Sequence, residues 1–192
     1  MKSAKTYHHG DLRNALLDAA RAILEEEGLA ALSLRAVARR AGVSHAAPYR
    51  HFPNHEALLV ELAVEGFGEL RSELIGAAAP SEPVPDRISQ VGAAYMRFAA
   101  RRPALLRLMF GPQLPGRLDH PQLRAAADSI GEEIGNALNG PTLGLATWAA
   151  VHGLAMLSIE NIVDLGQRRD GPAVLPSRAG ILLRGLFNLA AP

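Results

Sequence analysis

The sequence predicts an all-α protein, and two observations support that prediction. Apolar residues recur every three or four positions along most of the chain, which is the spacing of one helix face, and no strand-like alternation persists. Glycine, proline and asparagine interrupt this pattern at short intervals, as expected where helices end. Apolar residues make up 48% of the 192 residues and charged residues only 20%, so the chain can bury a sizeable core.

Three short helices are expected in the first 55 residues. The first ends at a glycine, and its three closing glutamates, Glu25 to Glu27, are expected to face solvent. Ser33 is a suitable N-cap for a second helix over residues 34–41. Ser44 is a suitable N-cap for a third helix that reaches Phe52.

A long fourth helix is expected to start at residue 55 or 56, capped by Asn54. Four of its glutamates recur at spacing four and are expected to face water, because like charges at that spacing repel one another: Glu61, Glu65, Glu69 and Glu73. Further helices are predicted near residues 86–102, 103–110, 121–138, 142–164 and 176–189, with a polar loop over 167–175. The chain is therefore expected to divide into a small unit over residues 1–55 and a larger helical unit over residues 56–192.

The last two predicted helices, about 142–164 and 176–189, carry apolar residues on nearly every side. Such helices must be covered on more than one side. We therefore expect a homodimer in which these two helices contact a second copy of the chain. The uncharged stretch over residues 134–159 is interpreted as a buried helix rather than a membrane span, because asparagine, glycine and proline interrupt it.

Basic residues gather at the N-terminal end. Residues 1–55 carry eight lysines and arginines against five acidic residues, a net charge of +3, whereas residues 56–192 carry twelve against fourteen, a net charge of −2. Five of the seven histidines also lie in the first 55 residues. This asymmetry favours a polyanionic partner at that end.

Several functional classes find no support in the residues. The chain has no cysteine, which excludes thiolate metal sites and fits a reducing compartment, and no signal-type segment is found, so a cytoplasmic location is expected. No nucleophile, phosphate-loop, dinucleotide or zinc motif is present, so we expect neither catalysis nor a cofactor nor a metal site. The adjacent His8 and His9 are interpreted as surface or DNA-proximal side chains rather than metal ligands.

Residues 33–52 are the segment most suited to binding. Two short helices joined by a glycine-containing turn can place the second helix in the major groove of DNA. That helix would present phenol, imidazole and guanidinium groups, which can bind phosphate or a guanine edge. From the residues alone, a structural helical hairpin with solvated charges is the alternative.

Ordered motifs in this region resemble the N-terminal domain of TetR/AcrR transcriptional regulators over about residues 8–60. The motifs are His8-His9-Gly10-Asp11-Leu12-Arg13, Ser33-Leu34-Arg35, Ala41-Gly42-Val43-Ser44 and Tyr49-Arg50-His51-Phe52-Pro53-Asn54-His55. The resemblance implies a three-helix DNA-binding domain with a helix-turn-helix, in which Tyr49 and His51 grip phosphates. The implied set of DNA-contacting residues is Ser33, Arg35, Ser44, His45, Ala46, Tyr49, Arg50, His51 and His55.

The chain departs from the family pattern at two positions. His55 stands where lysine is common, which should weaken a phosphate contact near neutral pH, because imidazole is mostly neutral there. Pro48 lies inside the expected recognition helix, where its missing N–H removes about the first intrahelical bond. We expect the helix to tolerate Pro48 so near its start.

Three stretches of the larger unit, residues 95–98, 102–110 and 148–153, resemble a C-terminal subclass of the family with a tryptophan–histidine–glycine signature. The resemblance implies a ligand-binding and dimerisation domain. Aromatic and sulfur-containing side chains there could line a pocket for a small apolar or amphipathic effector: Tyr95, Phe98, Met109, Phe110, Trp148, His152 and Met156. The alternative is ordinary core, with His152 hydrogen-bonded to a carbonyl.

The expected function is that of a ligand-responsive transcriptional regulator, most simply a repressor. As a dimer it would bind a palindromic operator through two recognition helices, and a small molecule that prefers another dimer geometry would release it. The alternatives are a DNA-binding regulator without a small-molecule ligand, an activator, or a helical scaffold that does not touch DNA.

Overall fold

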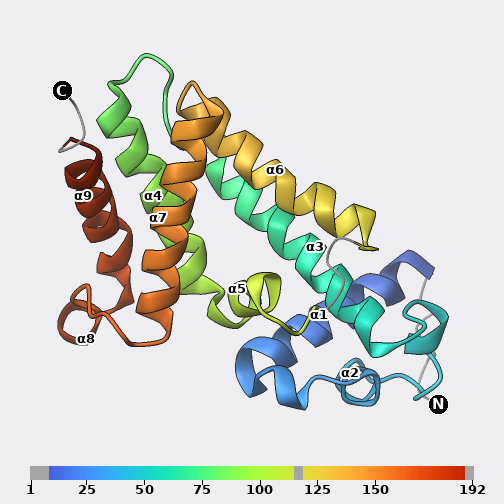
Figure 1. Cartoon of the computed structure of the whole chain (residues 1–192). Helices are drawn as coiled ribbons and strands as arrows, with labels where there is room; N and C mark the ends of the chain where they lie inside the picture. Colours follow the sequence, from blue (N-terminus) through green and yellow to red (C-terminus); the bar gives the residue numbers. More distant parts are fainter. Residues whose placement is uncertain (1–8, 115–118, 189–192) are drawn as a thin grey trace.

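The computed structural model describes residues 9–114 and 119–188, and every regular element in those ranges is a helix (Figure 1), which confirms the all-α prediction. His8 lies outside the described residues. The elements in chain order are α1 (His9–Glu27), the 3-10 helix η1 (Leu29–Ala31), α2 (Leu34–Arg40), the 3-10 helix η2 (Pro48–Arg50), α3 (His55–Leu74), α4 (Val84–Arg101), α5 (Pro103–Phe110), α6 (Pro121–Ala137), α7 (Pro141–Ile159), α8 (Gln167–Asp170), the 3-10 helix η4 (Pro172–Val174) and α9 (Leu175–Asn188).

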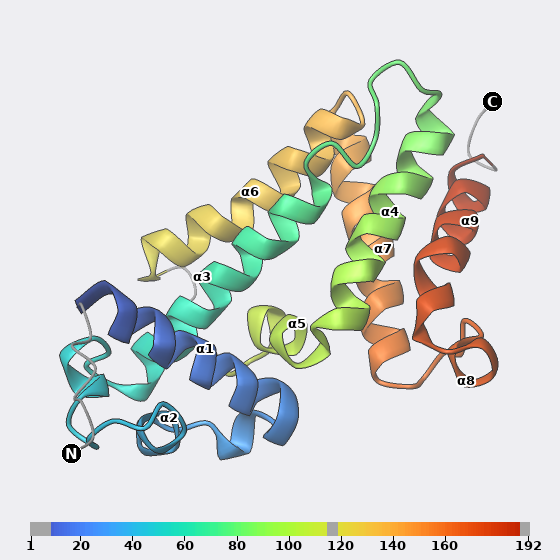
Figure 2. The same ribbon diagram turned by 180° about the vertical axis from the view of Figure 1, so that it is seen from behind.

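The helices form a small head and a larger body. α1, α2 and η2 make the head, at the lower right of Figure 1, and α4, α6, α7 and α9 make most of the body. α3 runs from the head into the body without a break, and α5 lies between α1 and the body in both views (Figures 1 and 2). The predicted boundary after residue 55 thus falls at the start of a helix that both parts share, and the boundary stays a prediction.

Two of the predicted N-caps are confirmed. The Ser33 hydroxyl oxygen accepts a hydrogen bond from the Ala36 N–H at 3.1 Å, and α2 starts at the next residue. The Asn54 side-chain oxygen accepts from the Ala57 N–H at 2.8 Å, and α3 starts at His55. Each cap satisfies one of the N–H groups that a helix start leaves without an intrahelical partner.

The prediction that the penultimate helix reaches residue 164 is wrong, because α7 ends at Ile159. Asn161 adopts a left-handed conformation with φ of 57°. The Ile162 N–H then donates to the Leu157 carbonyl at 2.9 Å, and the Asn161 N–H donates to the Ser158 carbonyl at 3.1 Å. This pair of bonds closes a helix as a glycine would, because asparagine tolerates the left-handed region. The predicted polar loop over 167–175 is also wrong in part, since α8 and η4 lie within it.

The prediction that the α3 glutamates face water is wrong. All four form ion pairs with arginines of α1, α4 or the residue that follows α4, and their side chains are half-buried. The pairs are Arg13–Glu61, Arg21–Glu65 at 2.6 Å, Arg21–Glu69 at 3.1 Å, Arg102–Glu69 at 3.4 Å, Arg97–Glu73 at 3.7 Å and Arg101–Glu73. The repulsion within one helix is offset by cations on its neighbours, which the spacing along α3 alone does not reveal.

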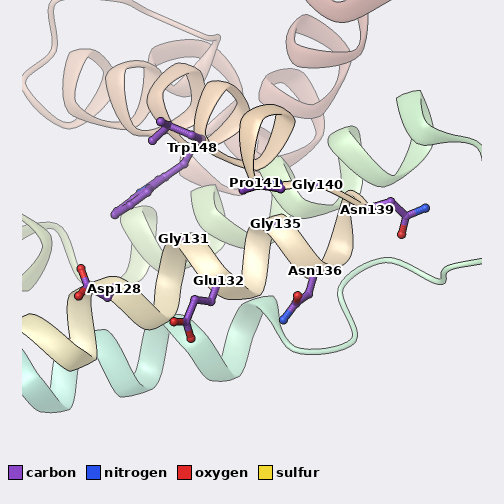
Figure 3. A pocket seen from close by; sticks show the side chains of 10 residues that line it. Asp128, Gly131, Glu132, Gly135, Asn136, Asn139, Gly140, Pro141 and Trp148 are labelled. Carbon is purple, nitrogen blue, oxygen red and sulfur yellow. The ribbon is translucent and has the colours of Figure 1, made fainter.

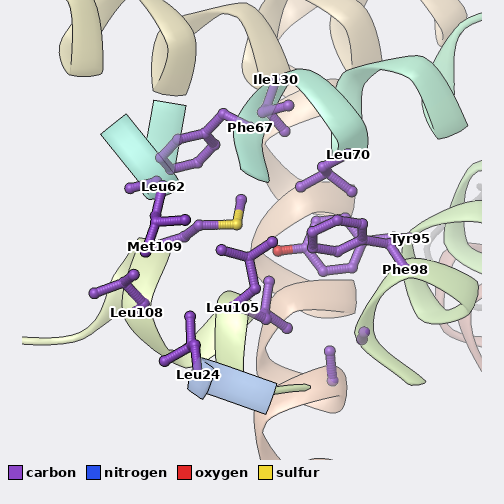
Figure 4. Close-up of a cluster of buried hydrophobic side chains, with 14 of the residues drawn as sticks. Leu24, Leu62, Phe67, Leu70, Tyr95, Phe98, Leu105, Leu108, Met109 and Ile130 are labelled. Atoms are coloured by element: carbon purple, nitrogen blue, oxygen red, sulfur yellow. The ribbon is translucent and has the colours of Figure 1, made fainter. Parts of the chain in front are cut away.

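The core continues from the head into the body through α3 and α5 (Figure 4). Phe67 and Leu70 of α3, Tyr95 of α4 and Met109 of α5 are fully buried there. α3 and α5 approach closely at Gly66, where an added Cβ would lie 2.7 Å from the Met109 sulfur. A larger residue at Gly66 would therefore push α5 away from α3.

Candidate DNA interface and candidate ligand site

The expected recognition helix over residues 44–52 is wrong in form. Residues 45 and 46 form a turn, and only Pro48–Arg50 form a helix, the 3-10 element η2. The Ala47 N–H donates to the Ser44 carbonyl at 3.0 Å, and the His51 N–H donates to the Pro48 carbonyl at 2.9 Å. Proline has no N–H with which to satisfy the Ser44 carbonyl from four residues away, so the chain tightens to three-residue spacing.

The Ser44 side chain does not cap this element. The residue before η2 is Ala47, which has no side-chain cap. The prediction that Pro48 is tolerated in an α-helix is therefore wrong, and the segment presents its side chains from a turn followed by one turn of 3-10 helix. The Phe52 N–H still reaches the Pro48 carbonyl at 2.9 Å, and Phe52 is buried beneath the element.

All nine predicted DNA-contacting residues lie at the surface of the head. His51 is half-buried and the other eight are exposed, including Tyr49 at 52%. They come from the start of α2, the turn after it, η2 and the start of α3. The fold therefore keeps these nine side chains available to a partner.

The arginines of the head fall into two groups. Arg13, Arg21 and Arg40 form ion pairs with glutamates, and the Arg13 guanidinium also lies 5.8 Å from the centre of the Phe52 ring. The hydrogen bond that Arg40 donates to the Glu26 carboxylate raises the pKa of Arg40. Arg35 and Arg50, by contrast, are exposed and make no ion pair with any residue in the described ranges.

Arg39 belongs to the second group and was missed by the sequence analysis. It is exposed in the last turn of α2 and has no ion pair within residues 9–114 and 119–188. The doublet of Arg39 and Arg40 was the available signal, but only the fold shows which of the two is neutralised. Within the described part of the chain, the guanidinium groups of Arg35, Arg39 and Arg50 thus stay free of carboxylates and can bind phosphate or base edges.

The body brings four of the seven predicted ligand-binding residues together. The Tyr95 hydroxyl lies 2.9 Å from Nδ1 of His152, so this histidine has a phenol as a polar partner, where the alternative interpretation expected a carbonyl. The Phe110 ring lies 4.3 Å from the His152 ring and 6.2 Å from the Trp148 ring, measured between centroids. These side chains come from α4, α5 and α7 and form one aromatic cluster.

Burial raises the pKa of the Tyr95 phenol well above its usual range, so the phenol is protonated at neutral pH. The Trp148 indole lies near enough to oppose this shift, although its N–H does not reach hydrogen-bonding geometry. The direction of the Tyr95–His152 bond depends on the histidine tautomer, because a neutral imidazole has one donor and one acceptor nitrogen.

The other three predicted ligand-binding residues belong to the surrounding core. Phe98 and Met109 are fully buried, Phe98 beside Tyr95 on α4 and Met109 among leucines (Figure 4). Met156 is half-buried on α7. These three side chains pack in or against the hydrophobic core around the aromatic cluster.

A hollow of about 920 Å³ lies elsewhere, between α6 and α7 (Figure 3). Among the seven predicted residues, only Trp148 lines it. The α6 side contributes polar groups that the sequence analysis did not single out: Asp128, Glu132, Asn136 and Asn139. Trp148 rests against α6 at Gly131, where an added Cβ would lie 3.5 Å from the indole.

Five large apolar side chains of α7 and α9 are exposed. They are Leu145 (63% exposed), Leu157 (40%), Ile181 (69%), Leu182 (52%) and Leu186 (55%). We refer to these five residues as the α7–α9 face. α7 is also long and apolar enough to span a membrane by length and composition, which is weak evidence because core helices of soluble proteins meet the same criteria.

Comparison with protein families places the head and the body in one family. Residues 16–62 match the model of bacterial regulatory proteins of the tetR family, and residues 88–171 match a tetracyclin repressor-like C-terminal domain. Together these matches cover more than half of the chain. The chain belongs to the tetR family of transcriptional regulators. The tryptophan–histidine–glycine subclass stays a prediction.

Individual curated relatives match only part of the chain, at 32% and 31% identity. The chain is 32% identical over 77 residues to the HTH-type transcriptional regulator BetI of Rhizobium meliloti, which is 40% of this chain and 38% of that protein. It is 31% identical over 115 residues to the nucleoid occlusion factor SlmA of Marinomonas sp., covering 59% of this chain and 58% of that protein. The chain thus matches less than two thirds of the length of these curated relatives.

A solved structure of a protein with unknown function from Rhodococcus sp. RHA1 has the same fold over nearly the whole length. It is 32% identical, covers 95% of this chain and 98% of that one, and has a TM-score of 0.73. The shared fold therefore extends over both the head and the body of the chain. The matching family model describes bacterial regulatory proteins.

Proposed function

We propose that the chain is a cytoplasmic, dimeric repressor that binds a palindromic operator through residues 33–55 and is released by a small effector. The observation that supports DNA contact most strongly is that Arg35, Arg39 and Arg50 of the head are exposed and form no ion pair with any described residue, and that Tyr49 is exposed as well. Guanidinium pairs with phosphate or with guanine edges, and phenol hydrogen-bonds phosphate.

The proposed contacts divide by chemistry. Tyr49, His51 and His55 contact phosphates and fix the position of the head, whereas His45, Ala46 and Arg50 lie nearer the base edges. Ser33, Arg35 and Ser44 contact the backbone beside them. Because a turn and η2 replace an α-helix here, fewer side chains reach the groove than from a full recognition helix.

The α7–α9 face supports the dimer. Its five side chains are between 40% and 69% exposed, although leucine and isoleucine gain about 1.5–3 kcal/mol each when fully buried. A second copy related by two-fold symmetry offers the same face, so apolar side chains would meet apolar side chains. The dimer would place two heads on one DNA duplex.

Selection of bound duplexes from random DNA tests this proposal. We expect a palindromic consensus, and binding that weakens as salt rises, because phosphate contacts release counterions. Tyr49→Ala should weaken binding about tenfold, while Tyr95→Ala destabilises the body without changing the selected sequence. An absent or non-palindromic consensus would refute the dimeric operator complex.

A second candidate is a regulator without a small-molecule ligand. The filled packing around Tyr95, Phe98 and Met109 favours it, since these side chains are fully buried against neighbours. An effector there must displace side chains. Thermal-shift and DNA-release measurements across a broad metabolite panel separate the two: a compound that raises the melting temperature and releases DNA supports the ligand-responsive form. A panel without effect supports the ligand-free form.

A further inference from the structure

Two carboxylates of α6 line the hollow between α6 and α7 without a close cationic partner. Asp128 and Glu132 are both exposed there. Within the described ranges, the ion pairs of α6 involve Asp128 and Glu133, so Glu132 has none. Asp128 lies 3.7 Å from Arg124 of its own helix, but these side chains are 65% and 61% exposed, and such a pair contributes little. No lysine, arginine or histidine of the described residues lines the hollow.

The carboxylates of α3, in contrast, are neutralised within the fold. Glu65, for example, lies 2.6 Å from Arg21 of α1. Asp128 and Glu132 have the same spacing of four residues, so their charges repel one another, and only the weak contact with Arg124 offsets this repulsion. A cation from outside the chain could therefore stabilise this pair.

The glutamates at the end of α1 also have partners within the fold, and the expectation that all three face solvent is wrong for Glu25. Its half-buried carboxylate accepts from two backbone N–H groups at the start of α5, at 3.1 and 3.3 Å, and so caps that helix. Glu26 and Glu27 are exposed, but the Arg40 guanidinium lies 2.5 Å from the first and 3.2 Å from the second. The carboxylate pair of α6 differs from these groups because it lacks a close partner.

The opposite wall of the hollow, on α7, is apolar. Leu145 and Trp148 line it together with Pro141. Figure 3 shows the indole reaching from α7 toward α6, where it lies beside Gly131. Gly131 and Gly135 place no side chain in this space, so the hollow stays open between the two walls. An indole ring attracts a cation that lies over its face, by about 0.5–1 kcal/mol at exposed sites.

A ligand can enter this hollow without displacing core side chains. Its volume of about 920 Å³ is within the usual range of small-molecule sites. Around the aromatic cluster, by contrast, Phe98 and Met109 are fully buried, so a ligand there must displace them. The hollow is therefore the more accessible of the two candidate sites.

We propose that the hollow binds an amphipathic organic cation, with its positive group near Asp128 and Glu132 and its apolar part on Leu145 and Trp148. A neutral molecule of the same shape would gain only the apolar contacts, and an anion would be repelled by two like charges. The role of this cation as the effector rests on the proposed function, whereas its binding does not. Because Leu145 also belongs to the α7–α9 face, the bound cation would lie at the edge of the proposed dimer interface.

Three probes with one carbon skeleton test the proposal on the DNA-free protein: phenylbutylamine, which is protonated at neutral pH, the neutral phenylbutanol and the anionic phenylbutyrate. Calorimetry gives the affinities, and the emission of Trp148, the single tryptophan of the chain, reports binding at the hollow. We expect the amine to bind about tenfold more tightly than the alcohol, to bind more tightly still than the butyrate, and to change the emission. Equal affinities for amine and alcohol, no binding of the amine, or binding without a change in emission overturns the proposal.

Carboxylate variants locate the charge that is recognised. Glu132→Gln should weaken binding of the amine about fivefold and leave binding of the alcohol unchanged. Asp119→Asn is the matched control, because it removes an exposed carboxylate that precedes α6 and does not line the hollow. An equal loss of amine affinity in the two variants would mean that overall charge attracts the amine, and would overturn the site.

The effector role is tested separately, by fluorescence anisotropy of a labelled duplex taken from the DNA selection. The amine should weaken DNA binding by wild type more than DNA binding by Glu132→Gln. An equal effect on both proteins refutes the effector role, although the binding site stands on the DNA-free measurements. A protein that binds the amine but no DNA refutes the proposed function alone.

Discussion

The helix-turn-helix surface and the α7–α9 face are both exposed, yet their chemistry is opposite. The first presents tyrosine, histidines and arginines that form no ion pair with a described residue, and the second presents four leucines and one isoleucine. Arginines elsewhere in the head, such as Arg21, are already neutralised by glutamates of α3. Exposure alone therefore does not identify a binding surface. The interactions that a surface leaves unmade indicate its partner: an anion for the head and a second apolar face for the body.

The largest effect is expected from a charge placed on the apolar α7–α9 face. Ile181→Glu places a charge on the α7–α9 face, where it would be buried without a partner in a dimer. We expect the dimer to weaken by about 100-fold or more, measured by sedimentation over a concentration series. Ala125→Glu, at an exposed position of α6, is the control and should leave association unchanged. Equal association of both variants would mean that another face forms the dimer.

A smaller effect is expected on the ionic side, where a free arginine can be compared with a paired one. Arg50→Gln should lower DNA affinity about tenfold and reduce by about one the slope of log affinity against log salt. Arg40→Gln removes the same charge from a residue that Glu26 and Glu27 already neutralise, so the slope should stay near wild type. Identical slopes in the two variants would contradict the distinction between free and paired arginines.

One polar contact inside the body can be removed while the apolar packing around it is kept. Tyr95→Phe removes the hydroxyl that lies 2.9 Å from His152, leaving that buried nitrogen without this partner. The free energy of unfolding should fall by about 1 kcal/mol, measured by urea denaturation. Tyr49→Phe, on the exposed head, should leave stability unchanged. A Tyr95→Phe protein as stable as wild type would show that the contact contributes nothing to stability.

The smallest effect is expected at Glu65 of α3, which forms an ion pair with Arg21 of α1. Burial raises the pKa of the Glu65 carboxyl, and Arg21 only partly opposes this. The folded state therefore binds this proton more tightly than the unfolded state, so the stability from this group is present at low pH and is lost as pH rises above the ordinary glutamate range. Glu65→Gln should flatten that part of the curve of unfolding free energy against pH. An unchanged curve would assign the slope to other carboxyls.

Local patterns predicted what depends on neighbouring residues in the chain. The caps at Ser33 and Asn54 followed from short polar side chains before apolar runs, and both are present. The all-α class followed from helical spacing. Pro48 was noticed in the sequence, but its consequence was underestimated: its missing N–H shortens the expected recognition helix to η2, although the predicted side chains remain at the surface.

Contacts between distant segments could not be predicted in this way. The sequence around the α3 glutamates does not show which arginines lie opposite them. The sequence also does not distinguish Glu25 from Glu26 and Glu27, which differ only because α5 and α2 pack against different sides of α1. The hollow between α6 and α7 likewise exists only because these two helices lie side by side. Charge pairing and capping between helices depend on where the helices lie relative to one another. The spacing of residues along one helix does not give that information.

The sequence by itself determined the all-α class, the family and the side chains available for contact with DNA, because helical periodicity and ordered motifs are local properties. Only the tertiary structure decided which of those charges are free, since an arginine is neutralised by whichever carboxylate the fold brings to it. The tertiary structure also decided that α5 contacts both α1 and α7, because its capping carboxylate at Glu25 lies about 80 residues away along the chain.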